Sequence, residues 1–485
     1  MIYLLLILFP VVMGASSFLL RKQTRLVIGA AALTTLVQIA LAAQIPLDEP
    51  ARLLGLTLTL DPLSRLFLLA FLAVGGLAFL ATLRLPHGEN FVPIALVILG
   101  VVCAVLLLMQ EPFVVSLLLV SAGLLAVLAI VDLPTGSPGL VERAVIATAL
   151  KYLVLILIAG VMMYMAFVLV NIYRPGDLPG RASPAHLILA LMVVGFGLRL
   201  AVAPFHSWLP DLAEDAAPMV SVLVVAVINT TSLLFLINSF QFFPVVVLEN
   251  ERGLELLSGL GALTALLGAL LALGQAGLRR TCGYLLVYNA GAVLLGLASA
   301  TPVGLAGAVF ESFNQLIAVL LLFVCIGLLE RPDGRPANVV RRDLLWRWPV
   351  AGAGLIGGAL ALLGLPPFGG FASKLLLYHA AAGRGQAYLA ALLLATAIAA
   401  LALLRLARER LLGAPEGLPA APPPPLLGET ELDRPPERRL EPEPRGLALL
   451  TAGLLGLSLA IGLHPQPLLA TIEEVIRGLT FVRPV

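Results

Sequence analysis

Four ionisable side chains interrupt long apolar runs of this sequence, and they could carry charge or protons through a medium that excludes water. They are Lys151, Arg199, Glu311 and Lys374. An ionisable group inside an apolar membrane span costs at least about 2.5 kcal/mol, so each is a candidate for function. A lysine removed from water can lose and regain a proton near neutral pH, which makes Lys374 the foremost candidate for loading a proton. Because apolar residues continue beyond Lys374, function is favoured over snorkelling of its ammonium to an interface.

The other three ionisable residues each allow a second interpretation. Arginine stays protonated even when buried, so Arg199 either holds an anion or water in place or serves as a structural anchor. Glu311 either lies on a proton pathway, paired with a cation or protonated, or meets water near the end of its helix. Lys151 stands beside Tyr152 and is either a pathway residue or an ordinary interfacial anchor.

A histidine follows Arg199 closely in the sequence. His206 lies in the run 204–211, and Asp211, Glu214 and Asp215 come shortly after it. Histidine titrates near neutrality, which suits a proton relay or gate at the mouth of a channel. A lone histidine is more often a packing residue at a helix end, but the neighbouring acids favour the relay here.

Four amide side chains lie in the same apolar runs: Asn229, Asn289, Asn314 and Gln315. Such groups could hold water molecules between the ionisable residues. They could equally hydrogen-bond one helix to another, and both interpretations stay open.

Helix breakers stand in the middle of two of the apolar runs that carry these cations. Pro204 follows Arg199, whereas Pro366, Pro367, Gly369 and Gly370 precede Lys374. Proline removes a backbone donor and clashes with the preceding turn. In hydrocarbon, an interrupted helix is tolerated only where protein or water satisfies the freed backbone groups. Two breaks at matching places in two repeats therefore indicate an ion pathway, although tight helix packing would also use Gly and Pro.

The composition predicts the long helices that would position these side chains. Hydrophobic residues make up 60% of the 485 and charged residues 12%, with a mean hydropathy of +1.04. A soluble domain carries about 25% charged residues, so a soluble protein is excluded. Apolar runs of about 20 residues are long enough to cross hydrocarbon, and their continuity excludes a barrel. The sequence therefore predicts an all-α integral membrane protein of about 14 spans: 2–20, 26–44, 64–83, 91–110, 113–131, 145–170, 186–209, 218–241, 255–275, 282–299, 304–329, 348–380, 386–406 and 446–464.

The two breaks lie five spans apart, in the seventh and twelfth spans, which divides the chain into repeats. We predict an N-terminal three-helix segment at 1–90, a first repeat at 91–241, a second repeat at 255–406, a cytoplasmic linker at 411–445, and a last helix and tail at 446–485. The linker is rich in Pro, Glu and Arg, a composition that forms no packed core. Within the tail, one or two interfacial helical turns are expected between Ile472 and Leu479.

Lysine and arginine gather in the loops on one side of the predicted spans. Because positive loops stay in the cytoplasm, both termini are expected outside it, in a multi-pass protein of a bacterial-type cytoplasmic membrane. The net charge of +2 without a basic stripe excludes nucleic-acid binding. The three cysteines lack ligand spacing, so packing is favoured over a metal site or disulfide. No motif for a nucleotide, haem or iron–sulfur cluster is present, and any electrons must travel elsewhere.

Two motifs give this sequence a family resemblance. The run Arg199-Leu-Ala-Val-Ala-Pro-Phe-His-Ser-Trp-Leu-Pro-Asp211, followed by Ala217-Pro-Met-Val-Ser221, is similar to a signature of the antiporter-like, proton-pumping membrane subunits of respiratory complex I. The run Leu363-Gly-Leu-Pro-Pro-Phe-Gly-Gly-Phe-Ala-Ser-Lys374 resembles the broken twelfth helix of that family. The same superfamily includes Mrp-type cation/proton antiporters and membrane-bound hydrogenase subunits.

The resemblance implies 14 helices with two inverted five-helix repeats, and it makes Lys374 the ionisable residue of the second half-channel. A lysine at that position suits the N-type chain. The resemblance further implies a subunit of NADH–quinone oxidoreductase that has no catalytic centre of its own. NADH, FMN, iron–sulfur clusters and quinone would belong to partner subunits. Other membrane-arm subunits, the lipid bilayer and protons would be the partners of this chain.

The first half-channel departs from the family pattern, because neutral residues or arginine stand where the family has titratable groups. Where the family has a glutamate, this sequence has Val120 or Ser121. Two family lysines align with Arg199 and Asn229, and a family histidine and lysine align with Gln315 and Val319. Either this half no longer conducts protons, or Glu311 and Lys151 replace the missing groups. Two alternatives therefore stay open beside the complex I subunit: an Mrp-type antiporter or hydrogenase subunit, and a structural membrane spacer without an ion path.

Overall fold

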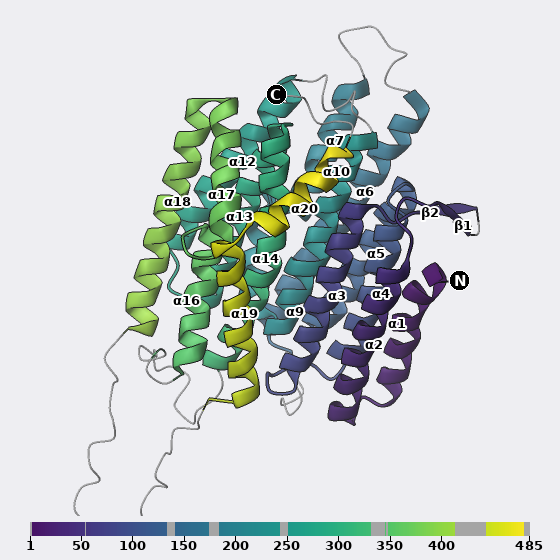
Figure 1. Ribbon diagram of the computed structural model, residues 1–485, viewed down its shortest axis with the longest axis vertical. Coiled ribbons are helices and arrows are strands. Elements are labelled where there is room, and N and C mark those ends of the chain that lie inside the picture. The colour runs from purple at the N-terminus through teal and green to yellow at the C-terminus, as the bar shows by residue number, and fades with distance from the viewer. Residues whose placement is uncertain are drawn as a thin grey trace, which may run out of the picture.

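The structure, a computed structural model, describes residues 2–53, 55–132, 141–173, 184–242, 251–330, 345, 348–412 and 443–479. The greater part of the predicted linker, 413–442, and the basic loop at 331–344 lie outside the described residues. The elements run side by side as a bundle of helices (Figure 1).

The N-terminal segment contains three helices and a small hairpin. Its elements are α1 (Ile2–Leu19), α2 (Thr24–Gln44), β1 (Ala51–Leu53), β2 (Leu56–Leu58) and α3 (Pro62–Thr82). The strands pair antiparallel with Ala51 opposite Leu58, and the sequence analysis did not predict them. Helix α3 begins after Asp61, whose carboxylate accepts a hydrogen bond from the Ser64 backbone N–H at 2.8 Å.

A unit of helices with one interruption follows. Its elements are α4 (Phe91–Leu107), α5 (Pro112–Ile130), α6 (Arg143–Tyr173), α7 (Pro184–Arg199), η1 (Phe205–Ser207), α8 (Trp208–Asp215), α9 (Pro218–Val222), η2 (Leu223–Asn229) and α10 (Thr230–Phe242). Helix α7 ends at Arg199, and the chain resumes helical structure only at Phe205, so the predicted break near Pro204 is confirmed. The segment η2 is a π-helix in the middle of a span, which the sequence analysis did not predict.

A second unit repeats this order of three helices, an interrupted helix and a further helix. Its elements are α12 (Glu251–Leu273), α13 (Leu278–Ala298), α14 (Pro302–Leu329), α16 (Pro349–Leu363), α17 (Gly370–Arg384), α18 (Gln386–Leu406) and η3 (Ala407–Leu411). Helix α16 ends at Leu363 and is followed by Gly364, which has a φ of +75°, and α17 begins at Gly370. The second predicted break is therefore confirmed as well.

The last elements are α19 (Arg445–Leu463) and α20 (Gln466–Arg477). Helix α20 lies obliquely across the bundle (Figure 1) and packs on α14 and α3. Its side chains Ile472 and Ile476 are buried in that contact. The tail thus contains a full helix that begins earlier than the expected turns.

Eleven of the described helices are long and apolar enough to cross a membrane, which confirms the predicted all-α membrane fold. Shorter apolar helices at 91–107, 186–199 and 349–363 stand at three further predicted spans. The total of 14 spans stays a prediction.

The core of the bundle is formed by helices that are apolar all round. In α13, α14 and the span 218–240, roughly nine tenths of the residues are buried inside the protein. In α1 and α19 only 22% of the most apolar stretch is buried, and leucines such as Leu449 and Leu404 on the outer helices are exposed. The polar side chains described next lie in or beside the buried helices.

Candidate functional site

A buried ion pair joins α14 to α17 directly after the second break. The ammonium Nζ of Lys374 lies 3.6 Å from Oε1 of Glu311, and both side chains have no exposed surface. Two charges removed from water are tolerated only when they are paired and hydrogen-bonded. The sequence analysis had named both residues separately, and the structure brings them together.

Amide and hydroxyl groups complete the surroundings of this pair. Lys374 Nζ donates a hydrogen bond to Oδ1 of Asn289 on α13. Glu311 accepts hydrogen bonds from the Ser373 hydroxyl and from Nδ2 of Asn314. Asn289 in turn donates to Oε1 of Gln315 at 2.8 Å. Three of the four amides named from the sequence therefore surround the ion pair. We call this group the Lys374 cluster, and its members are Lys374, Glu311, Asn289, Asn314, Gln315 and Ser373.

The broken helix shapes this cluster through its backbone. Asn314 Nδ2 also donates to the Ala361 carbonyl at 3.0 Å, so it satisfies one of the acceptors at the end of α16. A Cβ on Gly364 would collide with Cγ of Lys374, and a Cβ on Gly370 would collide with the Ala361 carbonyl oxygen. Glycine at these two positions lets the lysine stem and the two half-helices approach closely.

A chain of hydroxyl groups lies beside the cluster and includes a residue of α18. The Lys374 ammonium lies 4.7 Å from the ring centre of Tyr288. The Tyr288 hydroxyl is 2.8 Å from the Thr396 hydroxyl, which is also 2.8 Å from the hydroxyl of Tyr378. Tyr378 is partly exposed, so the three hydroxyls lead from the tyrosine whose ring contacts the buried lysine to the edge of the described core. These residues could not be predicted from the sequence, because no local spacing links two tyrosines and a threonine that lie on three different helices.

The guanidinium of Arg199 is buried at the first break, apart from the Lys374 cluster. It is 1% exposed, and Nε donates to the Ser232 hydroxyl while Nη2 donates to the Leu119 carbonyl, both at 2.6 Å. Its Nη1 finds no acceptor among the described residues. No carboxylate in the described part of the chain forms an ion pair with Arg199, and the partners seen there are the dipoles of a hydroxyl and a carbonyl group.

Lys151 belongs to a third group, nearer the surface. Its Nζ lies 2.7 Å from Oδ2 of Asp211 on α8, and the other oxygen of Asp211 lies 3.3 Å from Arg280 on α13. Arg280 also binds Glu214 at 2.9 Å. The side chains of Lys151 and Asp211 are 37% and 23% exposed, which agrees with an anchoring role for Lys151. Asp211 thereby bridges a cation of the first unit and a cation of the second.

His206 lies beside this surface group and is half-buried. Its ring centre is 6.4 Å from that of Tyr284 on α13. Its Nδ1 is buried and makes no hydrogen bond to the described part of the protein. The predicted acids Asp211 and Glu214 are engaged by Arg280, and Asp215 accepts a hydrogen bond from Thr148. The five predicted pathway residues therefore fall into separate groups, of which only Lys374 and Glu311 share a direct contact.

The chemistry open to the Lys374 cluster is proton exchange. It contains a base, an acid and hydroxyl and amide groups in hydrogen-bonded succession, in surroundings that exclude bulk water. Such an arrangement can shift a proton between groups whose charges depend on each other. Among the described residues, no group of His, Cys, Asp and Glu is arranged to hold a metal ion.

A family model of membrane proteins matches the part of the sequence that contains these residues. The model for the transmembrane region of NADH:quinone oxidoreductase and Mrp antiporter proteins matches residues 142–399, which include both broken helices. The chain belongs to this family. Its match covers the Lys374 cluster, Arg199 and the surface group around Asp211.

Curated relatives of this NADH:quinone oxidoreductase/Mrp antiporter family member are named as quinone oxidoreductase subunits. NADH-quinone oxidoreductase subunit N 2 of Acidobacterium capsulatum is 33% identical over 218 residues, which are 43% of this chain and 44% of the relative. NADH-quinone oxidoreductase subunit N of Desulfovibrio desulfuricans is 33% identical over 218 residues, 42% of each chain. The chain thus spans about half the length, or less, of the curated relatives it matches.

Solved structures of the family share the whole fold. The Mrp complex of a Dietzia species contains a chain with a TM-score of 0.80 and 20% identity, covering 98% of this chain and 97% of that one. A chain of respiratory complex I from Thermus thermophilus has a TM-score of 0.79 at 20% identity and covers all of both chains. Both structures are similar to this chain in the arrangement of their helices.

Proposed function

We propose that this chain is a membrane-arm subunit of a proton-translocating NADH–quinone oxidoreductase and that protons pass through its Lys374 cluster. The observation that carries the proposal is the buried pair of Lys374 and Glu311 beside an interrupted helix. Charges at this depth are costly and mark ion pathways in membrane proteins. The names of the relatives support the quinone oxidoreductase over the Mrp-type antiporter and the hydrogenase subunit.

Within this proposal, Lys374 and Glu311 exchange a proton according to the charge around them. When a further positive charge approaches the pair, Lys374 releases its proton, and the nearby carboxylate of Glu311 accepts it before the proton moves on. When that charge withdraws, Lys374 takes up a proton again and restores its pairing with Glu311. The hydroxyls of Tyr288, Thr396 and Tyr378 form one arm of the route, and Asn289 with Gln315 forms another.

The first unit has a different role in this proposal. Arg199 keeps its proton, so it supplies a fixed positive charge instead of a loading site. Lys151 and Asp211 hold α6 against α8, while His206 lies at the same end of the bundle as a relay candidate. Proton conduction is therefore assigned to the second unit.

Redox chemistry belongs to partner subunits in this proposal. NADH, FMN, iron–sulfur clusters and quinone are bound there, and this chain has no catalytic centre of its own. Electron transfer in the partners changes the field along the membrane arm, and the Lys374 cluster responds to that field. The proposal places the chain in a bacterial-type cytoplasmic membrane with both termini outside the cytoplasm.

The test is the ratio of protons pumped to electrons transferred by the assembled complex in liposomes. Lys374→Ala is expected to lower this ratio, and Leu375→Ala is the matched control because the neighbouring leucine is 50% exposed and outside the cluster. An unchanged ratio in a normally assembled Lys374→Ala complex would remove the cluster from the route and favour a structural spacer. Proton movement driven by a sodium gradient without electron transfer would instead favour an antiporter.

A further inference from the structure

The ammonium of Lys374 lies among groups that also bind metal cations. Its Nζ lies 2.5 Å from the amide oxygen of Asn289 and 3.6 Å from Oε1 of Glu311, and it is 4.7 Å from the ring centre of Tyr288. Carboxylate and amide oxygens are the ligands that hard cations prefer, and the face of an aromatic ring also attracts a cation. The ammonium thus occupies a position that suits a small cation.

The charge of the surrounding groups fits a cation with a single charge. Among the described residues, Glu311 forms an ion pair only with Lys374. The remaining members of the Lys374 cluster are neutral amides and a hydroxyl. One carboxylate is balanced by one positive charge, whereas a divalent ion would leave an excess charge in a place without exposed surface. The position therefore suits an ion such as sodium better than magnesium or calcium.

The stem of Lys374 holds the ammonium in this position. The stem passes directly over Gly364, where an added Cβ would collide with Cγ of the lysine. No part of the side chain is exposed, so the ammonium cannot leave the cluster without unpacking the surrounding helices. A free ion can dissociate from its ligands, whereas this cation is tethered to α17 by covalent bonds.

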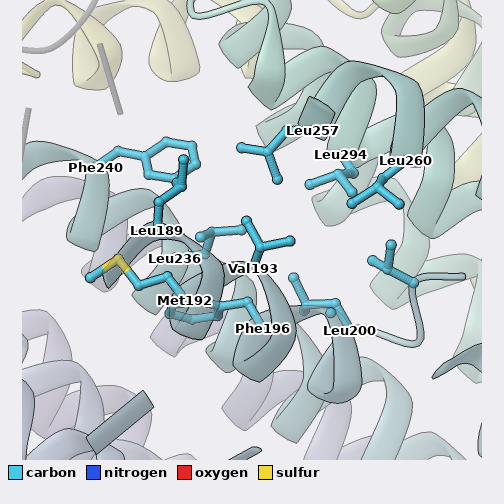
Figure 2. A pocket seen from close by; sticks show the side chains of 12 residues that line it. Leu189, Met192, Val193, Phe196, Leu200, Leu236, Phe240, Leu257, Leu260 and Leu294 are labelled. Carbon is cyan, nitrogen blue, oxygen red and sulfur yellow. The ribbon is translucent and has the colours of Figure 1, made fainter. Parts of the chain in front are cut away.

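Three other places in the described part of the chain lack this combination of groups. The guanidinium of Arg199 contacts a hydroxyl and a carbonyl group but no carboxylate. Lys151 and Asp211 are partly exposed, so water competes for their charges. The hollow between α7, α10, α12 and α13 (Figure 2) is lined by apolar side chains, which offer no ligand to a cation. Of these places, only the Lys374 cluster joins a buried carboxylate to neutral oxygen ligands.

We propose that the Lys374 ammonium fills a site for one monovalent metal cation and thereby keeps sodium ions out of the proton route. This inference rests on the proposed proton function and adds which ion the route accepts. The nitrogen and the stem of Lys374 stay in place when a proton leaves. A sodium ion would have to displace the whole side chain to reach Glu311 and Asn289. Lys374 is therefore the residue that makes the route specific for protons.

Sodium binding by the purified complex tests this inference. Lys374→Ala removes the side chain beyond Cβ, which leaves space for an ion and frees the oxygens of Glu311 and Asn289. In equilibrium dialysis with radioactive sodium, the Lys374→Ala complex is expected to bind one ion more than the wild-type complex. Leu375→Ala is the matched control, because this neighbouring leucine is 50% exposed and outside the cluster, and it should bind as much sodium as the wild type.

Two further variants make the result specific. Lys374→Ala/Glu311→Leu should lose the additional ion, because the carboxylate that balances its charge is gone. If Lys374→Ala does not assemble in sodium chloride, Lys374→Gln is measured in its place, since it keeps part of the stem beside Gly364.

Equal sodium binding by the wild-type complex and the assembled Lys374 variant would overturn the proposal, because Glu311 would then be neutralised by a proton instead of an ion. Additional sodium that persists without Glu311 would also overturn it, since the ion would then lie elsewhere. The dialysis does not measure pumping, so a negative result leaves the proton route intact. A normal proton-to-electron ratio in Lys374→Ala would contradict that route without altering the sodium result.

Discussion

The ammonium of Lys374 lies 3.6 Å from the carboxylate of Glu311, and neither side chain reaches the protein surface. The pair connects the third helix of the second unit, α14, to the half-helix that follows its break, α17. In the first unit, Lys151 of the third helix pairs at 2.7 Å with Asp211 of the half-helix after the break. The two units thus carry ion pairs on corresponding elements, with the charges exchanged.

The two pairs differ in their contact with solvent, and this difference decides what each can do. Lys151 and Asp211 are 37% and 23% exposed, so their interaction is weak and screened. Lys374 and Glu311 are both fully buried, so the loss of either partner leaves an uncompensated charge. Only the second pair therefore couples a change of protonation to a large change in energy.

Gly364→Ala is expected to disturb the Lys374 cluster through the backbone. The residue has a φ of +75°, which costs alanine about 1 to 2 kcal/mol, and the added Cβ would collide with Lys374. The variant should unfold at a lower temperature and pump fewer protons per electron. Gly453→Ala in α19 is the control, because no atom lies within 4 Å of its added Cβ and alanine favours a helix by about 0.5 to 1 kcal/mol. Equal melting temperatures for the two variants would argue against the strained geometry at Gly364.

Arg199→Met is expected to destabilise the protein less than Glu311→Leu. The arginine has no carboxylate partner among the described residues, so its removal also relieves the cost of burying its charge. Loss of Glu311 leaves Lys374 unpaired and should cost about 3 to 5 kcal/mol. Thermal melting of the two purified variants gives the comparison. A loss of stability in Arg199→Met as large as that in Glu311→Leu would reveal a negative partner outside the described residues.

Asp211→Ala is expected to cost more stability than Lys151→Ala. Removal of Lys151 breaks one exposed pair, which is worth about 0 to 1 kcal/mol. Removal of Asp211 breaks its contacts with both Lys151 and Arg280 and loosens the link between the two units. The melting temperatures of the two single variants and of the double variant test this order. If Lys151→Ala proves the more damaging change, Asp211 does not bridge the units as described.

The length of the apolar runs and the positions of the helix breakers were enough to predict most of the fold. The continuous apolar runs predicted nearly every helix, and the interruptions near Pro204 and at 364–369 lie where the sequence analysis expected them. Two features escaped prediction because they have no compositional signature. The π-helix at 223–229 depends on packing in the buried core, and the hairpin at 51–58 is too short to show a periodic pattern.

The charged residues of the candidate site could be predicted from the sequence, but most of the contacts between them could not. The cost of burying charge identified Lys374, Glu311 and Arg199. The pairing of Glu311 with Lys374 could not be predicted, because the two residues are far apart in sequence, and Arg199 has no carboxylate partner among the residues that the structure describes. The hydroxyl chain from Tyr288 to Tyr378 depends on the tertiary arrangement of α13, α17 and α18, which no local pattern records.

The most direct test of the proton route replaces both members of the buried pair at once. In Lys374→Met/Glu311→Leu, two apolar side chains of similar size take the place of two charges, a change that is often neutral or stabilising in a packed interior. We expect that this complex assembles, transfers electrons and pumps clearly fewer protons per electron than the wild type in liposomes. A normal proton-to-electron ratio in the assembled double variant would contradict the claim that protons pass through Lys374 and Glu311.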